Sequence, residues 1–358
     1  MSELRRRLGE LRRHRRASGR RIVDSVAEFA AACGPGAQVI ELPAPAPNAP
    51  PRPPQHLEPS LQPVLAELAE PWELRDVCVA VLPGAWLETP HGVVVARDGS
   101  VLAASAWSTE NLVATGVLER RPRRKRALPG RHASLIAQFR GYFHWLTEAL
   151  PRIAALRLVG LGDVPLIGPA APTRLHHESL DLLGVTRWTP YRDGAAPDVL
   201  VWPRPVASTG HPPRWACLWL REQLAGGARP RGNGRLYISR RDAASRRVAN
   251  EDEVLALLRR EGFEAVQPER LSVAEQARLF AGADVVVAPH GAGNANVLFS
   301  DGATLIEIFE PGLVNGCYYT LSQALGHPYW YLMGGRVGSS DIHVPLDRLE
   351  RVLAAALG

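Results

Sequence analysis

The sequence ADVVVAPHGAGNANVLF, residues 283–299, constrains the fold of this chain more than any other stretch. Residues 285–288 form a continuous apolar and mostly β-branched run, which is typical of a parallel strand buried on both faces. The glycines after His290 allow a sharp turn and let a ligand approach main-chain amides closely. A helix that begins at this turn would offer free N–H groups and a partial positive charge to an anion, usually a phosphate. The segment therefore predicts a strand, a glycine-rich turn and a helix at the ligand-binding edge of an α/β sheet.

The glycine turn matches neither of two well-known phosphate-binding patterns. Asn296 stands where the dinucleotide fingerprint GxGxxG needs its third glycine. No Gly-Lys-Ser/Thr follows, so the turn is not a Walker A loop either. The alternative is a tight turn whose glycines serve only the backbone.

Strands and helices alternate through the C-terminal half of the sequence. β-Branched and aromatic runs predict strands at residues 236–239, 263–266 and 304–309. Two capping patterns predict helix starts, Asn250 with Glu253 and Ser272 with Glu275. The expected helices span residues 250–261, 272–280 and 314–325, and a last helix, 345–356, can pack on either half of the chain. This alternation is typical of a parallel, doubly wound sheet.

The N-terminal half is less regular. A basic helix is expected over residues 1–32, and the Pro-rich residues 43–54 predict an extended linker. A longer helix is expected over residues 134–158, and the glycine-rich residues 226–234 form the best domain boundary. Short strands are expected at residues 78–82, 92–96, 101–104, 165–167 and 199–201 and near Trp188, with a hairpin turn at 97–100. The chain thus divides into three parts, residues 1–56, 57–228 and 229–358.

The net charge of +6 rests almost wholly on arginine, because Lys125 is the only lysine. Two basic clusters, residues 4–21 and 119–126, could contact nucleic acid or an anionic membrane. Binding of a single strand would require aromatic residues between these charges, and there are none. Nucleic acid is therefore not the expected partner. A solvated helix face and a surface loop are the favoured interpretation.

Cysteine spacing and hydropathy favour a cytoplasmic protein. The four cysteines are far apart and form no Cys-x-x-Cys, so neither a zinc knuckle nor a redox pair is indicated. Buried thiols in a reducing compartment are the simplest interpretation. No run approaches the roughly 20 apolar residues that span a bilayer, and no apolar signal region is visible near the N-terminus.

Three charged residues are expected at the carboxyl ends of strands in the C-terminal half. Arg240 and Arg241 directly follow the strand at 236–239, and two guanidiniums there could clamp a diphosphate. Glu307 lies inside the apolar sequence LIEIF and could accept the paired hydroxyls of a ribose. The alternatives are surface charge for the arginines and an Arg-paired structural carboxylate for Glu307.

A second group of functional candidates lies in GYFHWLTEALPRI, residues 141–153. On a helix, His144 and Glu148 stand at i and i+4 and share one face, which Pro151 then ends or kinks. Such a pair can form a base with an orienting partner, as removing a proton from a sugar hydroxyl requires. An amphipathic helix with an incidental polar pair is the alternative. His-x-x-x-Glu is half of a zinc motif, but His-Glu-x-x-His is absent and no third ligand is indicated.

In combination these motifs resemble glycosyltransferase family 61, whose bacterial members are often labelled capsular polysaccharide biosynthesis proteins. The likeness rests on GYFHWLTEALPR, LYISRRDAASRRVANEDEV, the stretch from LSVAEQ to the glycine turn, and LIEIF, and it covers roughly residues 141–319. It implies a GT-B-like α/β fold, with two Rossmann-like domains facing a cleft and a parallel sheet in the C-terminal one. It also implies inverting transfer from a nucleotide sugar without a bound metal.

The resemblance assigns roles to individual residues. His144 and Glu148 match the family's His and acidic residue, with Glu148 the expected base and His144 the alternative. Asn250, Glu251 and Gln276 match capping and packing positions. Ala295 and Pro289 depart from the expected pattern around the turn. The residues implied to bind the donor are Arg240, Arg241, His290, Gly291, Ala292, Gly293, Asn296 and Glu307.

The chemistry of the residues agrees with this resemblance. The chain contains no Asp-x-Asp, so arginines and helix amides would replace a metal on the leaving diphosphate. We therefore expect a glycosyltransferase without a cofactor that moves a sugar from a nucleotide-diphosphate sugar to a saccharide or glycolipid acceptor in surface polysaccharide assembly. Residues 57–228 would hold the acceptor, residues 229–358 the donor, and residues 1–56 would tether the enzyme to the inner face of an anionic membrane or to an assembly partner. A nucleotide-sugar epimerase and a non-catalytic anion-binding module are the alternatives.

Overall fold

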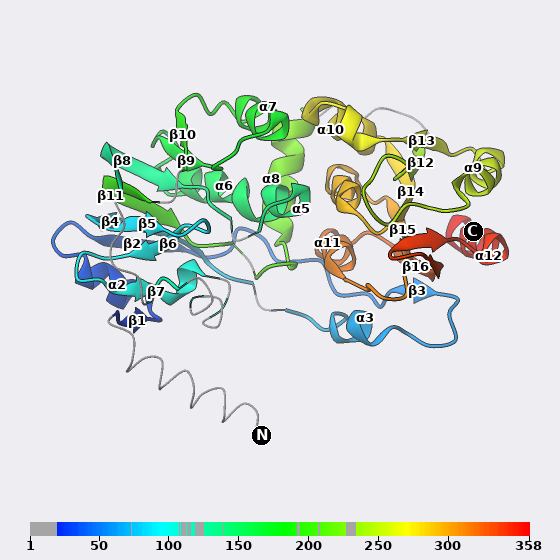
Figure 1. The fold of residues 1–358 in the computed structure, drawn as a ribbon, viewed down its shortest axis with the longest axis horizontal. Helices are drawn as coiled ribbons and strands as arrows, with labels where there is room; N and C mark the ends of the chain where they lie inside the picture. Colours follow the sequence, from blue (N-terminus) through cyan, green and yellow to red (C-terminus); the bar gives the residue numbers. More distant parts are fainter. Residues whose placement is uncertain are drawn as a thin grey trace, which may run out of the picture.

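The computed structural model describes residues 20–358, except positions 73, 107, 109–111, 113–115, 119–124, 138, 192–193, 207 and 227–233. Most of the two basic clusters and of the glycine-rich boundary at 226–234 therefore lies outside the described residues. The described chain forms two lobes, each built on one large sheet, with helices packed between and around them (Figure 1). In this part of the chain no helix is both long and apolar enough to cross a lipid bilayer.

The C-terminal lobe contains a six-stranded, all-parallel sheet. If the strands from β12 to β16 are numbered 1 to 5, they lie in the order 2-1-3-4-5. The strand order therefore reverses between the neighbouring strands β12 and β14. Open α/β sheets bind ligands at such a reversal, outside the carboxyl ends of the strands. In spatial order the strands are β13 (Glu264–Val266), β12 (Gly234–Ile238), β14 (Ala283–Pro289), β15 (Thr304–Phe309), β16 (Tyr329–Met333) and β3 (Gln55–His56).

Helices cover both faces of this sheet, which confirms the predicted doubly wound arrangement. Val285 and Val287 of β14 pack towards α9 (Glu251–Arg260) and α12 (Leu346–Leu357). Val286 and Ala288 alternate with them and face the opposite side. That side is covered by α10 (Val273–Ala281), the 3₁₀ helix η4 (Ala292–Phe299) and α11 (Cys317–Leu325). A short hairpin, β17 (Gly335–Val337) and β18 (Asp341–His343), precedes α12.

The N-terminal lobe contains a ten-stranded mixed sheet. Its parallel part is β11 (Ala195–Pro203), β8 (Arg126–Ser134), β9 (Leu166–Gly168) and β10 (Trp188–Pro190), in that order. Antiparallel neighbours extend it beyond β11. They are β4 (Val77–Pro83) with β2 (Gln38–Leu42), and β5 (Trp86–Glu88) with β6 (Val93–Val95) and β7 (Val101–Leu102), whose outer neighbour β1 (Ile22–Val23) is parallel. The predicted hairpin turn at 97–100 joins β6 to β7.

Helices of this lobe lie mainly on the side that faces the C-terminal sheet (Figure 1). The remaining helices of the described chain are α2 (Val26–Ala32), α3 (Pro63–Glu67), α5 (Tyr142–His144), α6 (Pro151–Leu158), α7 (Arg174–Leu182) and α8 (Arg214–Ala225). Two further 3₁₀ helices are η1 (Ala103–Ser105) and, after β13, η3 (Pro268–Arg270), and η2 (Trp145–Ala149) is a π-helical turn. Helix α8 packs against α6, α10 and η4, so its contacts reach both lobes.

Three secondary-structure predictions need correction. Within the expected basic helix at 1–32, the described residues form β1 and then α2, whose start is capped by the Ser25 hydroxyl. The expected helix at 134–158 begins only at Tyr142, because β8 runs to Ser134 and the Leu135 amide still bonds to the Ile167 carbonyl at 2.9 Å. The Asn250 side chain does not cap α9 and instead bonds twice to the backbone of Val344.

The division at residue 56 is also wrong in part. Residues 22–42, which were expected to belong to a separate tether, form β1, α2 and β2 of the N-terminal sheet. The Pro-rich residues 43–54 are extended, as predicted, and they cross to the other lobe, where β3 pairs with β16. Helix α3 follows β3 and buries Leu65 in the core between the lobes. The described part of the N-terminal segment therefore contributes strands to both sheets.

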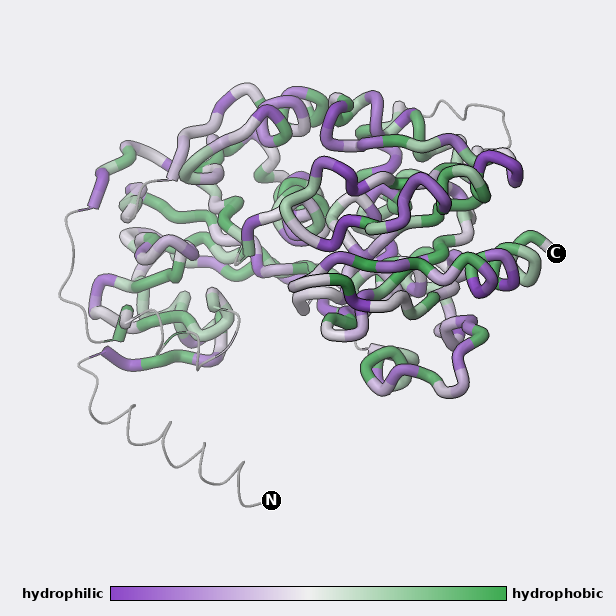
Figure 2. The backbone as a smooth tube through the Cα atoms, turned by 45° about the vertical axis from the view of Figure 1, so that its right-hand side comes forward, coloured by the Kyte–Doolittle hydropathy of each residue, from purple (hydrophilic) through white to green (hydrophobic). Residues whose placement is uncertain are grey.

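The hydrophobic core is continuous across the two lobes. One cluster of buried side chains runs from β8 and α6 through α8 to η4, α11 and the inner face of the C-terminal sheet. Hydrophobic segments accordingly run through the inside of both lobes, and the hydrophilic segments lie mostly at the surface (Figure 2). The two lobes therefore share one hydrophobic core.

Candidate active site

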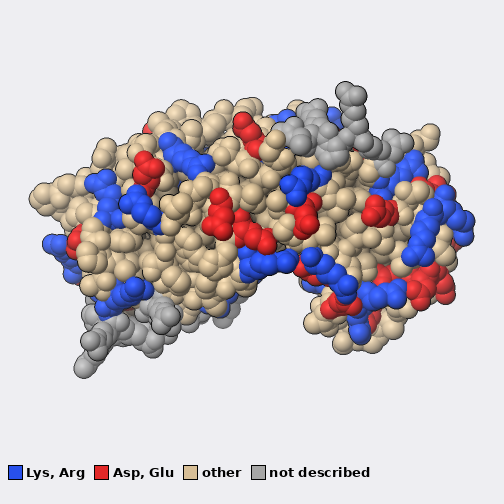
Figure 3. Space-filling view, turned by 90° about the horizontal axis from the view of Figure 1, so that it is seen from above, with Lys and Arg blue, Asp and Glu red and all other residues tan. Residues whose placement is uncertain are grey.

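A cavity of about 460 Å³ lies between the lobes, at the point where the strand order of the C-terminal sheet reverses. The C-terminal lobe contributes residues at the ends of three strands: 238–240 and 242–243 at the end of β12, 268, 269 and 271 after β13, and 292–293 after β14. The N-terminal lobe contributes Tyr142 of α5 and the start of α7. Seen from above, charges of both signs are interspersed over this side of the molecule (Figure 3). The cavity has the position at which doubly wound sheets bind their ligands.

Arg240 lies against the glycine turn, as the sequence predicted. A Cβ added to Gly291 would stand 2.1 Å from Arg240 Nη1, so only a glycine leaves room for this guanidinium. Arg240 Nε and Nη2 donate to the carbonyls of Arg246 and Ser245 at 3.2 and 2.9 Å, which fixes the side chain. Burial, followed by the positive charge of Arg246, lowers the pKa of Arg240. Arg240 lines the cavity together with Ala292 and Gly293.

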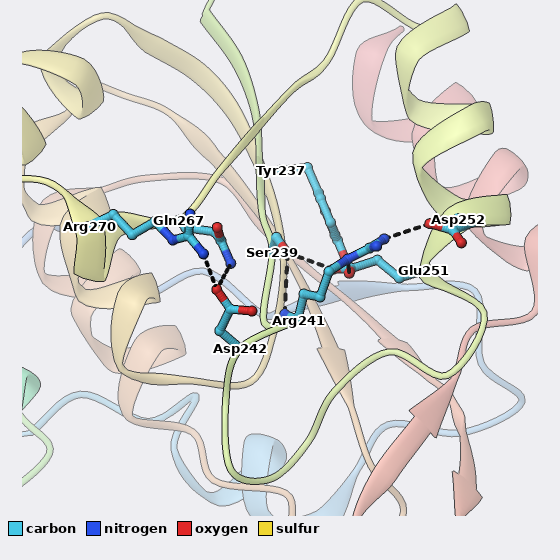
Figure 4. A network of polar contacts seen from close by, with 8 residues as sticks. All are labelled: Tyr237, Ser239, Arg241, Asp242, Glu251, Asp252, Gln267 and Arg270. Atoms are coloured by element: carbon cyan, nitrogen blue, oxygen red, sulfur yellow. Dashed lines mark hydrogen bonds and ion pairs between the residues drawn. The ribbon is translucent and has the colours of Figure 1, made fainter.

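Arg241 points away from the cavity, contrary to the prediction (Figure 4). Its Nε donates to Glu251 Oε2 at 3.0 Å, and its Nη2 donates to Asp252 Oδ1 at 2.5 Å. These hydrogen bonds to Asp252 and Glu251 raise the pKa of Arg241. The two adjacent arginines therefore point in different directions, Arg240 to the cavity and Arg241 to α9. Arg241 instead ties the end of β12 to the start of α9.

Glu307 does not fit its predicted contact with a ribose, because its side chain is completely buried. Its Oε1 lies 2.5 Å from His290 Nδ1, and its Oε2 accepts from the Tyr329 hydroxyl at 2.6 Å. Asn294 Nδ2 adds a longer contact of 3.4 Å. The carboxylate therefore orients His290, whose ring packs against Phe309 and Tyr318. Glu307 is a positioning residue for the first residue of the glycine turn.

Asn296 is also a positioning residue rather than a ligand contact, because it is fully buried. Its Oδ1 accepts from the Tyr142 hydroxyl at 2.6 Å, and its Nδ2 donates to Gln276 Oε1 and to the Gly293 carbonyl at 3.0 and 3.1 Å. One amide thus connects the glycine turn to α10 and to α5 of the other lobe. Asn296 stands at the position of the third fingerprint glycine for a structural reason, because a glycine has no side chain to make these bonds.

His144 and Glu148 form the predicted pair. His144 Nδ1 lies 2.8 Å from Glu148 Oε1, and the His144 side chain is 24% exposed against 9% for Glu148. The pair spans a π-helical turn, η2, in which the Leu150 amide bonds to the Trp145 carbonyl at 3.0 Å. Pro151, which has no N–H, follows this turn. The widened turn and the buried glutamate hold His144 in one orientation.

A second, apolar cavity of about 310 Å³ adjoins the first. It lies at the carboxyl ends of the parallel strands β8 and β9, and it shares Tyr142, Thr173 and Leu175 with the first cavity. Phe139, whose ring lies 5.0 Å from that of His144, lines this second cavity. His144 and Glu148 line neither cavity. Tyr142, two residues before His144, lines both cavities.

Sequence reasoning missed two residues that line this site. Tyr142 joins the two cavities, and only its place beside His144 on a short helix could have indicated it. Glu269 follows β13 and lines the first cavity, in a strand order that sequence alone does not supply.

The site can now be compared with known proteins. A comparison with curated protein sequences gives no match. Residues 142–306 match the family model described as Glycosyltransferase 61. The matched segment begins at the helix of His144 and includes Arg240, the glycine turn and the start of β15. This segment, which contains the residues that line the first cavity, is identified as a glycosyltransferase family 61 segment.

Proposed function

We propose that this protein is an inverting, metal-independent glycosyltransferase that moves a sugar from a nucleotide-diphosphate sugar to a hydroxyl acceptor. The observation that supports the proposal is the 460 Å³ cavity between the lobes, where the strand order of the C-terminal sheet reverses. Arg240, Ala292 and Gly293 line it from the C-terminal lobe, and Tyr142, two residues before His144, lines it from the N-terminal lobe. A donor bound there would lie beside an anion site and near the helix that carries the proposed base.

The donor would occupy the cavity with its diphosphate at β12 and β14. Arg240 and the amides after Gly291 would stabilise the negative charge that develops on the leaving diphosphate, which is the role a metal has in other transferases. The nucleoside would extend towards β13. There Glu269 lines the cavity without a hydrogen bond to any described residue, so its carboxylate can accept the ribose hydroxyls in place of Glu307.

The acceptor would enter from the N-terminal lobe. The apolar cavity beside Tyr142 offers aromatic walls from Phe139, Trp145 and Tyr191, which suit the face of a sugar ring or the apolar end of a glycolipid. His144 is the more exposed member of its pair, so we assign the proton transfer to His144 Nε2 and the orienting role to Glu148. The reverse assignment, with Glu148 as base, is tested below.

Incubation with a panel of nucleotide-diphosphate sugars and oligosaccharide acceptors, with and without EDTA, tests this function. We expect a glycosylated product of inverted anomeric configuration by NMR and the same rate in EDTA. Conversion of the donor sugar without any acceptor would indicate an epimerase. Donor binding without any product would indicate a binding module. Loss of turnover in EDTA would overturn the metal-independent mechanism.

We further propose a role in capsular or surface polysaccharide assembly at the cytoplasmic face of a membrane. The support is the basic cluster at 4–21, most of which precedes the described residues. Each basic residue near an anionic leaflet contributes on the order of 1 kcal/mol, and salt screens this attraction. Flotation with vesicles that contain 30 per cent anionic lipid, compared with neutral vesicles, tests it. Equal recovery with both would exclude this tether.

A further inference from the structure

Arg246 has a backbone conformation that arginine rarely adopts. Its φ is +56°, in the left-handed region, where residues other than glycine, asparagine and aspartate are uncommon. Such a conformation persists only where the surroundings impose it, and it often marks a functional site. Here Arg240 imposes it, because its guanidinium donates to the carbonyls of Ser245 and Arg246 itself. The charge of Arg246 also acts on Arg240, so the two side chains lie near each other, although Arg246 is not among the residues that line the cavity.

Two positive charges are thereby brought together without a shared counter-charge. Arg246 is half-buried, and its Nε is inaccessible to solvent and has no hydrogen-bond partner. Among the described residues neither Arg240 nor Arg246 forms an ion pair with a carboxylate. The nearby Glu310 is already paired with Arg336 and bonded to the Gly312 amide at 2.9 Å. A half-buried guanidinium whose buried Nε has no acceptor, beside a second guanidinium, is a strong site for an anion.

The position of this pair matches the anion site of the turn. Arg240 Nη1 lies over Gly291, and the charges of both arginines act on the hydroxyl of Tyr318 by lowering its pKa, against the larger effect of burial. The Tyr318 ring in turn lies 5.2 Å from the His290 ring. Arg246 therefore belongs to the group of side chains around the first residues of the turn, although it follows β12 by eight positions.

We propose that Arg246, and not Arg241, is the second guanidinium of a diphosphate clamp, and that it closes over the anion opposite Arg240. The inference rests on the proposed donor site and adds the residue that would contact the leaving diphosphate from the outer side. The ligand is a pyrophosphate-type anion, carried by a nucleoside or free. Planar guanidiniums bind such oxygens in bidentate fashion, which a single arginine cannot do for two phosphates.

Calorimetry with the full-length protein tests the clamp. The probes are UDP, GDP, ADP, dTDP, inorganic pyrophosphate and the four corresponding nucleosides. Arg246→Asn keeps a residue that tolerates the left-handed backbone and removes the charge. We expect its affinity for the preferred diphosphate and for pyrophosphate to fall about 10- to 100-fold, as for lost charge-assisted hydrogen bonds. Nucleoside affinity should be unchanged, and Arg246→Lys should lie between Arg246→Asn and the wild type.

The matched control is Arg247→Asn, because Arg247 is exposed and paired with Asp341 outside the cavity. Its affinities should stay within about twofold of the wild type. The melting temperature without ligand should not fall in Arg246→Asn, since the change removes backbone strain and an unpaired buried donor. A structural role would instead lower this melting temperature and weaken nucleoside binding as well, and that result would overturn the inference.

Two further outcomes separate this inference from the proposed function. If the wild type binds none of the nucleoside diphosphates, the proposed donor site fails and the clamp fails with it. If Arg240→Gln weakens diphosphate binding and Arg246→Asn does not, the donor site stands and Arg246 has no part in it.

Discussion

Three glutamates near the middle of this molecule are buried, and each is surrounded by hydrogen-bond donors. Glu148 meets His144, Glu307 meets His290 and Tyr329, and Glu251 meets Tyr237, Ser239 and Arg241. A buried carboxylate is costly unless such donors compensate it, so each glutamate restricts its partners to one geometry. At the scale of residues, the buried carboxylates hold the side chains that bond to them, His144 and His290 among them, in fixed orientations.

Gly291→Ala tests whether the glycine exists to admit Arg240. The backbone at Gly291 is extended, so alanine adds no strain, but its Cβ would collide with the end of the Arg240 side chain. A flexible side chain can move away, so we expect the melting temperature to change little. Diphosphate affinity measured by calorimetry should nevertheless fall about as much as in Arg240→Gln, and the double variant should be no worse than either.

Gly335→Ala is the matched control for this substitution. A Cβ there would meet nothing closer than 3.9 Å, and the residue lies on the β17 hairpin. Unchanged diphosphate affinity in both alanine variants would show that the close approach at Gly291 has no bearing on the anion site.

The two possible bases can be separated by chemical rescue. His144→Gly and Glu148→Gly should each lower kcat by roughly 10²–10⁴-fold and leave donor affinity nearly unchanged, because the donor binds the other lobe. Added imidazole should restore turnover to His144→Gly if His144 takes the proton. Rescue of Glu148→Gly by formate, with none of His144→Gly by imidazole, would reverse the roles. His177→Ala, on α7 outside both cavities, should keep full kcat.

At the scale of elements, the two predicted capping boxes had different outcomes. Ser272 and Glu275 bond reciprocally at the start of α10, as their spacing predicted. Asn250 has the same spacing to Glu253, but its amide meets both the N–H and the C=O of Val344, just before α12. A side chain that can reach a distant backbone has a competing use that local spacing cannot reveal. The sequence therefore located α9 correctly and misassigned the residue that precedes it.

Asn250→Ala and Asn250→Ser distinguish these two uses. Serine is a good helix cap but cannot reach both backbone atoms of Val344. Both variants should therefore lose about 1–2 kcal/mol of unfolding free energy, as expected for two hydrogen bonds. Urea unfolding measures this loss. Recovery of wild-type stability by serine would show that Asn250 acts as an ordinary cap.

His327, at the end of α11, makes the stability of the fold sensitive to acid. Its Nε2 accepts from the Gly302 amide at 3.2 Å, and burial, with the charge of Arg221 next, lowers its pKa from 6.5 to about 3. Below pH 6.5 the unfolded chain binds a proton that the folded chain does not, so the free energy of unfolding falls with pH by about 1.4 kcal/mol per unit. This contribution is complete above pH 6.5 and is lost progressively towards pH 3.

The measurement is urea unfolding at pH 7.5 and pH 5.0. His327→Gln, which does not titrate, should lose about 2 kcal/mol less than the wild type over this interval. Equal losses in the two proteins would show that His327 takes up its proton in the folded state as readily as in the unfolded one.

At the scale of the whole molecule, the sheet order decides what the site contains. The alternation of strands and helices predicted the parallel sheet, and most strand positions within it were correct. Sequence spacing could not supply the order 2-1-3-4-5, which brings Glu269 beside Arg240, nor the burial of Glu307 beneath His290. Those contacts join residues far apart in the chain, and local patterns carry no information about them. The GT-B arrangement itself stays a prediction.

Deletions test the contribution of the N-terminal segment. A chain that begins at residue 20 should fold with an unchanged melting temperature. A chain that begins at residue 57 loses β1, α2, β2 and β3, and with them the fully buried Phe29, so it should aggregate or unfold without cooperativity. Thermal unfolding followed by circular dichroism measures both. A cooperative transition at the wild-type temperature in the shorter chain would show that the segment is dispensable.

The Pro-rich crossing at 43–54 has a consequence for how this protein could be recombined. The segment that shows the kinship, residues 142–306, ends inside β15 and contains neither β4, which flanks β11, nor the strands at the far edge of the other sheet. Exchanging that segment between relatives would cut both sheets and leave each half with foreign neighbours. A chimaera that keeps its fold would therefore need to carry the crossing and the N-terminal strands along with the exchanged segment.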